Sequence, residues 1–490
     1  MDHSRGIGGR RAVGEYSRYC LSFGIRVQEL KARKLEKSSS RLTMNPRESN
    51  KVVQSLIQRQ STTPVHGLLR PRVLFLYMHP TFTAVALFLL ILSGPPKLRF
   101  RDLEASLRGE ADWVVFFHII VWGLAGSWVL LQIAKRLRAK RPVLRPRLPQ
   151  ILGLALIICL GASVWKSAAP AFTAFKVYQV LVSCLFTHIF VERFGVQSCL
   201  KAMLCGNALL CIGIAICAFL APDMVWTFSD FNPDPSRLYG ELIASTGVVS
   251  VLAIILLLTS VRRIWKAIPL SLLALFFSLL VLSLMRTAYI TVFVFLALVA
   301  LRRPNIKPLR RFAYCLFAFV LMLYACDRLP SVSRYRSPET ILTLSDRIGL
   351  WRHLTTVTLN QSPWFGLGYY SASRIHGPEY NPGLGTAHSM FFEVLSGGGL
   401  ISFALFLALC VTLSTYAARL LFLSGDRFSF ASAALFIACL LFGFAGETID
   451  SGPFAITFWC SAAILPRLHK WPSRTHPLLR RVAVHAASAS

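Results

Sequence analysis

The chain has 490 residues, of which 54% are hydrophobic and 15% are charged. Soluble domains carry about 25% charged residues, so this composition excludes an ordinary water-soluble protein. Basic residues outnumber acidic residues by 53 to 22, which gives a formal net charge of +31. The basic residues form short clusters between long apolar runs, a pattern typical of a multi-span membrane protein. Nucleic-acid binding is not expected, because almost no soluble scaffold is present to carry a basic groove.

The N-terminal stretch, residues 1–72, is polar and contains 15 basic and 5 acidic residues. We expect it to be a disordered cytosolic tail, because it has too few apolar residues to build a core. It also lacks the apolar stretch of a signal peptide.

Most of the twelve cysteines lie inside apolar runs and no Cys-x-x-Cys pair occurs. We therefore expect them to be small buried side chains rather than disulfides or metal ligands.

A transmembrane helix needs about 20 apolar residues. Residues 264–301 are too long an apolar stretch for one helix, so we expect two helices with a turn near 283–286. The sequence therefore predicts an all-α polytopic membrane bundle of about twelve transmembrane helices. The expected spans are 73–94, 112–134, 149–164, 174–191, 203–220, 240–259, 266–283, 286–301, 312–328, 393–416, 430–446 and 453–466.

Basic clusters in the short loops set the orientation of these spans. Loop 135–147 has seven basic and no acidic residues, whereas loop 221–239 has one Arg and three Asp. Basic loops stay in the cytoplasm, so both termini are expected there. The predicted parts are transmembrane helices 1–9 in residues 73–327, a large periplasmic loop at 328–392 between helices 9 and 10, helices 10–12 in 393–466, and a basic cytosolic tail at 467–490.

The long outer loop contains an amphipathic segment. Ser345 can cap a helix that begins at Asp346, with an apolar face formed by Ile348, Trp351, Leu354 and Val357. Such a helix would lie flat on the bilayer surface, either to seal the loop onto the bundle or to bind substrate. Pro363 would end it. The glycines that follow allow tight turns beside a ligand or a neighbouring piece of chain.

His388 lies at the point where this loop re-enters the membrane, just before the expected span at 393–416. A histidine at the mouth of a bundle suits either a structural or a catalytic role. Arg286, between two apolar spans, is also unusual, because an arginine there is costly unless it is paired or faces water. Glu447 and Asp450 are the outer-face carboxylates that could pair with it.

Several of these elements together resemble a known family. The segment 362–368, Ser-Pro-Trp-Phe-Gly-Leu-Gly, followed by His388-Ser389-x-x-x-Glu393 and a glycine run, resembles the signature of the O-antigen ligase and exopolysaccharide polymerase superfamily. Arg347-x-x-x-Trp351 resembles an element that precedes the signature in the chain.

Two further arginine motifs have the order seen in that family. Ser283-x-x-Arg286 is similar to its motif at a helix hairpin, and Arg237-Leu-Tyr-Gly is similar to its arginine before the sixth span. The resemblance covers about residues 150 to 465. Ser389 departs from the Asn that often follows the loop histidine, and residues 241–244 lack the usual Pro-Asn. These departures bear on the acceptor more than on the class.

The resemblance implies a glycosyltransferase of the bacterial inner membrane whose donor is a glycan on undecaprenyl diphosphate. The favoured form is an exopolysaccharide or O-antigen polymerase, whose acceptor would be another glycan. The alternative is an O-antigen ligase, whose acceptor would be a lipid A core. No cofactor is expected. Membrane lipids and a chain-length regulator or other polysaccharide assembly proteins are the expected partners. A polysaccharide transporter or flippase is the alternative from another class, although the sequence lacks the internal repeats that carriers often show.

The resemblance also suggests roles for the site residues. Arg237 and Arg286 would bind the diphosphate, because guanidinium groups hold phosphate oxygens in pairs and stay charged. His388 would accept the proton of the attacking hydroxyl or orient it.

Three more residues are expected to bind substrate or support the site. Arg347 and Trp351 would bind acceptor sugar or pack, and Glu393 would orient His388 or cap the tenth span. No Asp-x-Asp pair occurs in an outer loop and no His/Cys cluster has ligand spacing, so a metal-independent reaction is expected. Attack opposite the lipid diphosphate would invert the anomeric centre.

Overall fold

The structure is a computed structural model that describes residues 113–140, 142, 147–227, 237–240, 243–260, 267–302, 347–381, 385–424, 426–446 and 449–469. They belong to one of the two units into which the chain divides, Met78–Ser490. The tail at 1–72, most of the tail at 467–490, the spans expected at 73–94 and 312–328, and the cap expected at Ser345 lie outside the described residues. Those predictions are untested.

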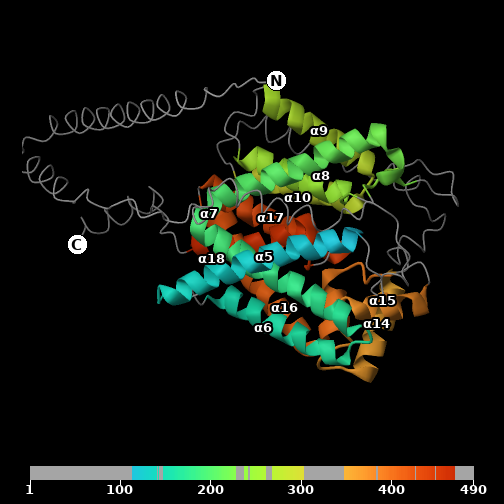
Figure 1. The fold of residues 1–490 in the computed structure, drawn as a ribbon. Coiled ribbons are helices and arrows are strands. Elements are labelled where there is room, and N and C mark those ends of the chain that lie inside the picture. The colour runs from blue at the N-terminus through green and yellow to red at the C-terminus, as the bar shows by residue number, and fades with distance from the viewer. Residues whose placement is uncertain are drawn as a thin grey trace, which may run out of the picture. The chain divides into compact units, whose positions relative to one another are not determined.

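The described residues form helices and one pair of short strands (Figure 1). Strands β1 and β2 pair antiparallel, with Trp226 opposite Leu238 and Thr227 opposite Arg237. For the described part of the chain, the all-helical class is therefore confirmed apart from this pair. The elements are α5 (Trp113–Arg138), α6 (Leu148–Ala162), η2 (Ser163–Lys166), α7 (Pro170–Leu220), η3 (Pro222–Met224), β1 (Trp226–Thr227), β2 (Arg237–Leu238), α8 (Thr246–Ser260), α9 (Ala267–Ser283), α10 (Arg286–Arg302), α14 (Arg347–Gln361), α15 (Ser371–Tyr380), α16 (Met390–Leu423), α17 (Arg427–Ala445) and α18 (Gly452–His469).

Five of the described helices are long and apolar enough to cross a membrane. They identify a helical membrane protein, and three shorter apolar helices lie within α8, α9 and α10. The break between α9 and α10 falls at residues 284–285, which confirms the turn expected near 283–286. The count of twelve spans stays a prediction. The five segments are Val115–Arg138, Leu148–Lys166, Pro170–Leu220, Met390–Phe422 and Arg427–Phe444.

Helix α7 contains two of the expected spans. At 51 residues a straight helix would be about 75 Å long, more than twice the thickness of the hydrocarbon core of a bilayer. Gly195 interrupts it with φ 82° and ψ 167°, a left-handed conformation that glycine adopts without strain. The loop expected at 192–202 is therefore helical on both sides of a single non-helical residue.

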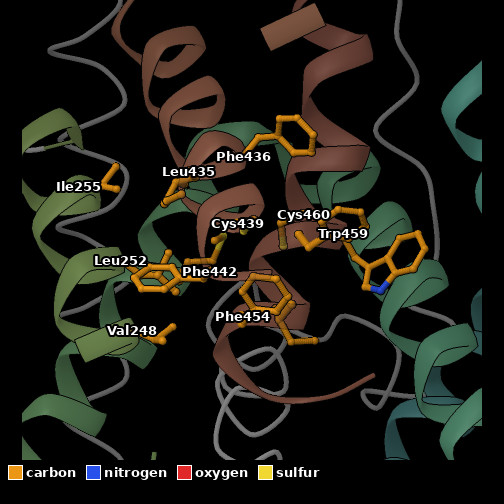
Figure 2. Packing of buried hydrophobic residues seen from close by; sticks show 14 of the residues in the cluster. Val248, Leu252, Ile255, Leu435, Phe436, Cys439, Phe442, Phe454, Trp459 and Cys460 are labelled. Atoms are coloured by element: carbon orange, nitrogen blue, oxygen red, sulfur yellow. The ribbon is translucent and has the colours of Figure 1, made fainter. Parts of the chain in front are cut away.

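Helix α18 is the centre of the packing. Every residue from Gly452 to Pro466 is buried, so this helix has protein on all sides. Figure 2 shows Phe454, Trp459 and Cys460 of α18 beside α17, with α8 on the other side of α17. Because lipid tails are as apolar as leucine, close fit between such side chains, rather than escape from water, holds these helices together.

Helix α16 is interrupted at Gly399, where φ is 70° and ψ is −171°. Backbone groups inside a membrane protein must be hydrogen-bonded within the protein, and a neighbouring loop, residues 363–368, bonds to those around the break. We call these two segments, 363–368 and 396–401, the interlock. Its four hydrogen bonds are Leu367 N to Ser396 O at 3.0 Å, Gly368 N to Gly397 O at 3.0 Å, Leu400 N to Pro363 O at 2.8 Å and Ile401 N to Trp364 O at 3.4 Å.

The interlock requires glycine because backbone lies directly on backbone. A Cβ on Gly366 would lie 2.5 Å from the carbonyl group of Gly397 and from the amide nitrogen of Gly399. Gly366 also has φ +71°, which side chains rarely adopt. The Pro-Trp-Phe-Gly-Leu-Gly segment and the glycine run of the sequence signature therefore meet each other. The neighbouring chain, rather than a ligand, explains these glycines.

We expect Gly366→Ala to lower the melting temperature of the detergent-solubilised protein. The left-handed backbone alone costs about 1–2 kcal/mol in a residue with a side chain, and the clash with Gly397 adds to this. Gly213→Ala is the matched control, because a Cβ on that glycine in α7 meets nothing within 4 Å. Equal melting temperatures for the two variants would contradict the interlock.

Candidate functional site

Four of the predicted site residues gather where the chain enters α16. Helix α14 provides Arg347 and Trp351, α16 provides Glu393, and His388 lies in the segment just before α16. Helix α15 packs against both α14 and α16 (Figure 1) and adds Arg374. We call these five residues the His388 group.

His388 has an unusual backbone. Its φ is +49°, in the left-handed region that costs a non-glycine residue about 1–3 kcal/mol and persists only where the surroundings enforce it. The imidazole is partly buried. Strained residues of this kind cluster at functional sites, so the conformation favours a functional role for His388 over a merely structural one.

Ala387, the residue before His388, is held through both of its backbone polar groups. The Ala387 N–H donates to Glu393 Oε2 at 3.3 Å, and the Ala387 carbonyl accepts from Trp351 Nε1 at 2.7 Å. Because both polar groups of Ala387 are fixed, the backbone that enters His388 has little freedom. We call this pair of contacts the Ala387 clamp.

Glu393 is fully buried at the start of α16. Its second oxygen, Oε1, accepts a hydrogen bond from Ser373 Oγ of α15 at 2.9 Å. Glu393 thus connects α15 to the segment that carries His388. Both carboxylate oxygens are engaged by the protein, so the geometry favours orientation of His388, one of the two roles expected for Glu393.

Trp351 is 7% exposed, so it does not lie on an exposed helix face. Its ring stacks on Phe392 with a centroid distance of 4.5 Å and an interplanar angle of 10°, and Phe444 covers it edge-on at 5.7 Å. These contacts leave little ring surface for a sugar. They support the packing role that the sequence left open, combined with the clamp on Ala387.

The buried face of α14 also differs from the expected one. Ile348 is 41% exposed, although the sequence placed it on the apolar face with Trp351. The residues that pack inward are Leu350, Trp351, Leu354 and Thr358. These residues form the face that packs against α15 and α16, and it overlaps the predicted face at Trp351 and Leu354. That the helix lies flat on the bilayer surface stays a prediction.

Two guanidinium groups affect the pKa of His388. Burial, and then the positive charges of Arg347 and Arg374, lower the pKa of His388 from its ordinary 6.5 to about 4. The imidazole is therefore neutral at physiological pH, which is the form that can accept a proton.

Arg374 was not among the predicted site residues. Its signal in the sequence was a basic residue four positions after Tyr370, which the helix α15 brings close to that ring.

Two cationic side chains lie against the ring of Tyr370. The Nζ of Lys176 lies 4.3 Å from the centre of the Tyr370 ring, and the Cζ of Arg374 lies 5.2 Å from it. Lys176 Nζ also pairs with Asp450 Oδ2 at 2.6 Å. Asp450, which the sequence offered as a partner for Arg286, thus has a partner on α7. Tyr370, like His388, has a positive φ, of 67°.

Arg237 and Arg286 come from a second group of segments. Arg237 lies in β2, with its guanidinium carbon 4.6 Å from the centre of the Tyr239 ring. Arg286 is the first residue of α10. The chain between β2 and α8 touches the turn before α10, because Ser245 Oγ lies 3.8 Å from the sulfur of Met285.

Arg286 occupies an electrostatically unfavourable position for a cation. The N-terminus of a helix carries a partial positive charge, so a guanidinium there is disfavoured unless an anion is present. Together, the amide groups of a helix N-terminus and a guanidinium suit a phosphate. That Arg237 and Arg286 bind the same ligand as His388 stays a prediction.

In the ranges given above for the structure, no group of three or more His, Cys, Asp or Glu side chains could hold a metal ion. The expectation of a metal-independent reaction stays a prediction.

The pKa of His388 can be measured by NMR in protein labelled with 15N-histidine, with the signal assigned by its loss in His388→Asn. We expect titration near pH 4 in the wild type. Arg347→Gln should raise that pKa, because it removes a positive charge that disfavours the imidazolium. Arg352→Gln, on an exposed position of α14, is the control and should leave the pKa unchanged. A wild-type pKa of 6.5 would contradict this electrostatic account.

A comparison with curated proteins found no match for this chain. Residues 270–407 match the family model Wzy_C, described as O-Antigen ligase. The matched stretch begins in α9 and contains Arg286, the whole His388 group and both segments of the interlock. Arg237 lies before it. Over these residues the match confirms the family expected from the sequence motifs, and it supports membership of the O-antigen ligase superfamily.

Proposed function

We propose that this protein transfers or polymerises a glycan from an undecaprenyl-diphosphate-linked donor at the periplasmic face of the bacterial inner membrane. The observation that carries the proposal is the strained conformation of His388, held by the Ala387 clamp within the stretch that matches the O-antigen ligase family. The proposal includes twelve spans, a periplasmic loop at 328–392 and both termini in the cytoplasm.

In the proposed reaction an acceptor hydroxyl attacks the anomeric carbon of the donor sugar. A new glycosidic C–O bond forms while the bond between that carbon and the diphosphate oxygen breaks. His388 takes the hydroxyl proton, and the lipid diphosphate leaves with the electron pair of the broken bond. Because attack and departure occur on opposite faces, the anomeric configuration inverts.

The roles of the charged residues follow from where charge develops. Arg237 and Arg286 would bind the diphosphate and stabilise it as it leaves, since guanidinium groups hold phosphate oxygens bidentately. A base with a pKa of about 4 is weak, so it gains the proton only as the attacking oxygen bonds to carbon and becomes acidic. This chemistry requires no metal, because arginine charge takes its place.

The acceptor decides between two forms of the proposal. In a polymerase the acceptor is another lipid-linked glycan, and in a ligase it is a lipid A core. We favour the polymerase, in agreement with the interpretation of the sequence. We expect a chain-length regulator or other polysaccharide assembly proteins as partners. The match to the O-antigen ligase family supports an enzyme rather than a transporter.

We expect His388→Ala to fail to rescue a deletion of this protein in its host, with glycans sized on a gel. Loss of a general base lowers the rate by about 10²–10⁴-fold. His376→Ala is the matched control, because this histidine on α15 bonds Glu379 at 3.0 Å and has no role in the proposal. Loss of long chains in the deletion strain indicates a polymerase, and long chains that persist only on the carrier lipid indicate a ligase. Full rescue by His388→Ala would contradict the assignment.

Trp351→Phe tests the clamp. Phenylalanine keeps the stacking on Phe392 but cannot donate to Ala387, so His388 loses part of its restraint. We expect about a tenfold lower kcat with little change in KM or melting temperature, measured on the purified enzyme. Trp364→Phe is the control, since Trp364 is 60% exposed. An unchanged kcat in Trp351→Phe would show that the clamp does not position His388.

A further inference from the structure

Arg374 has an unmet hydrogen-bonding group next to the proposed base. Its Nε is buried and has no hydrogen-bond partner within the described part of the chain. The guanidinium lies against Tyr370, and its charge acts on His388. A buried donor that stays unsatisfied destabilises the folded protein, so its presence calls for an explanation.

A second unmet group lies beside His388 in the chain. Ser389 is fully buried, and its Oγ has no hydrogen-bond partner among the described residues. It precedes α16 but does not cap it through its side chain. Most buried polar groups in proteins are hydrogen-bonded. Two unsatisfied donors in one small region indicate a site for a ligand with acceptor oxygens.

The nearby charges favour an anion. Lys176 is neutralised by Asp450, to which it is bonded at 2.6 Å, and Glu393 is occupied by Ser373 and Ala387. Arg347 and Arg374 are the positive groups that bear on His388. Arginine is suited to phosphate and carboxylate because its planar fork matches their oxygens.

In the proposed reaction, the base and the leaving diphosphate lie on opposite sides of the anomeric carbon. Groups that face His388 are therefore on the side of the acceptor. We propose that Arg374, with Arg347 and Ser389, forms a subsite for an anionic group on the acceptor sugar, either a phosphate or a carboxylate. This inference rests on the proposed function, and it adds the substrate class to a site whose acceptor was undefined.

An anion in this subsite would also improve the base. It would offset the positive charge of Arg347 and Arg374, and the pKa of His388 would rise from about 4 toward its ordinary value. The acceptor itself would thus make His388 a better proton acceptor when bound. Among the described residues, the charged groups near the site also include the Lys176–Asp450 pair and Glu393, which have partners within the protein.

The test uses the full-length protein in detergent and four probes: glucose 6-phosphate, methyl glucuronide, methyl glucoside and farnesyl diphosphate. Dissociation constants come from ligand-observed NMR. We expect at least one of the two anionic sugars to bind about tenfold or more tightly than methyl glucoside. Preference for the phosphate indicates a phosphorylated acceptor, and preference for the glucuronide indicates an acidic sugar. Equal binding of all three sugars would overturn the proposal.

Variants separate this inference from the proposed function. Arg374→Gln should remove the preference for the anionic sugar, and Arg352→Gln should retain it. Arg374→Lys keeps the charge but loses Nε, and should weaken binding of the anionic sugar severalfold. If Arg374→Gln does not fold, Arg374→Lys alone tests the subsite. Wild-type anion binding in Arg374→Lys and Arg374→Gln would overturn the subsite.

Farnesyl diphosphate reports on the donor side. Arg286→Gln should weaken its binding while anionic-sugar binding is unchanged. If Arg286→Gln has no effect on farnesyl diphosphate but Arg374→Gln still abolishes anionic-sugar binding, the donor assignment fails and the anion subsite stands.

Discussion

The interlock between residues 363–368 and the break in α16 is the constraint on which the site depends. A helix that opens at Gly399 leaves backbone groups that must be bonded inside the protein, and the four hydrogen bonds of the loop meet that need. The loop leads directly into α15, which carries Ser373 and Arg374. Ser373 then bonds Glu393, which holds Ala387 beside His388. Backbone fit in one place therefore fixes the position of a side chain in another.

The strain at His388 makes sense in this setting. A left-handed residue is stable only when its neighbours are fixed. Here a carboxylate accepts from the N–H of the preceding residue, Ala387, and an indole donates to the carbonyl of Ala387. Both belong to buried, well-packed side chains, Glu393 and Trp351. Rigid support of this kind holds a reacting group in a productive geometry, so little further conformational freedom is lost at the moment of reaction.

Hydropathy and motif order predicted much of this architecture. Apolar runs locate the described spanning helices because the bilayer fixes their length, and the turn between α9 and α10 followed from a stretch too long for one helix. The contacts between helices were not predictable. Arg374, the Lys176–Asp450 pair and the inward face of Trp351 all depend on packing between segments far apart in the chain. Ile348, which the sequence placed on the same face as Trp351, is exposed rather than packed inward. The sequence identified His388 and its motif. It also named Trp351 and Glu393, but their hydrogen bonds to Ala387 were not predicted.

The most direct test is to count products in proteoliposomes that contain the purified protein and a polyprenyl-diphosphate-linked glycan. The account predicts one polyprenyl diphosphate released for each new glycosidic bond, with inverted anomeric configuration. Movement of the glycan across the bilayer with no polyprenyl diphosphate formed would contradict it, and would identify a carrier instead.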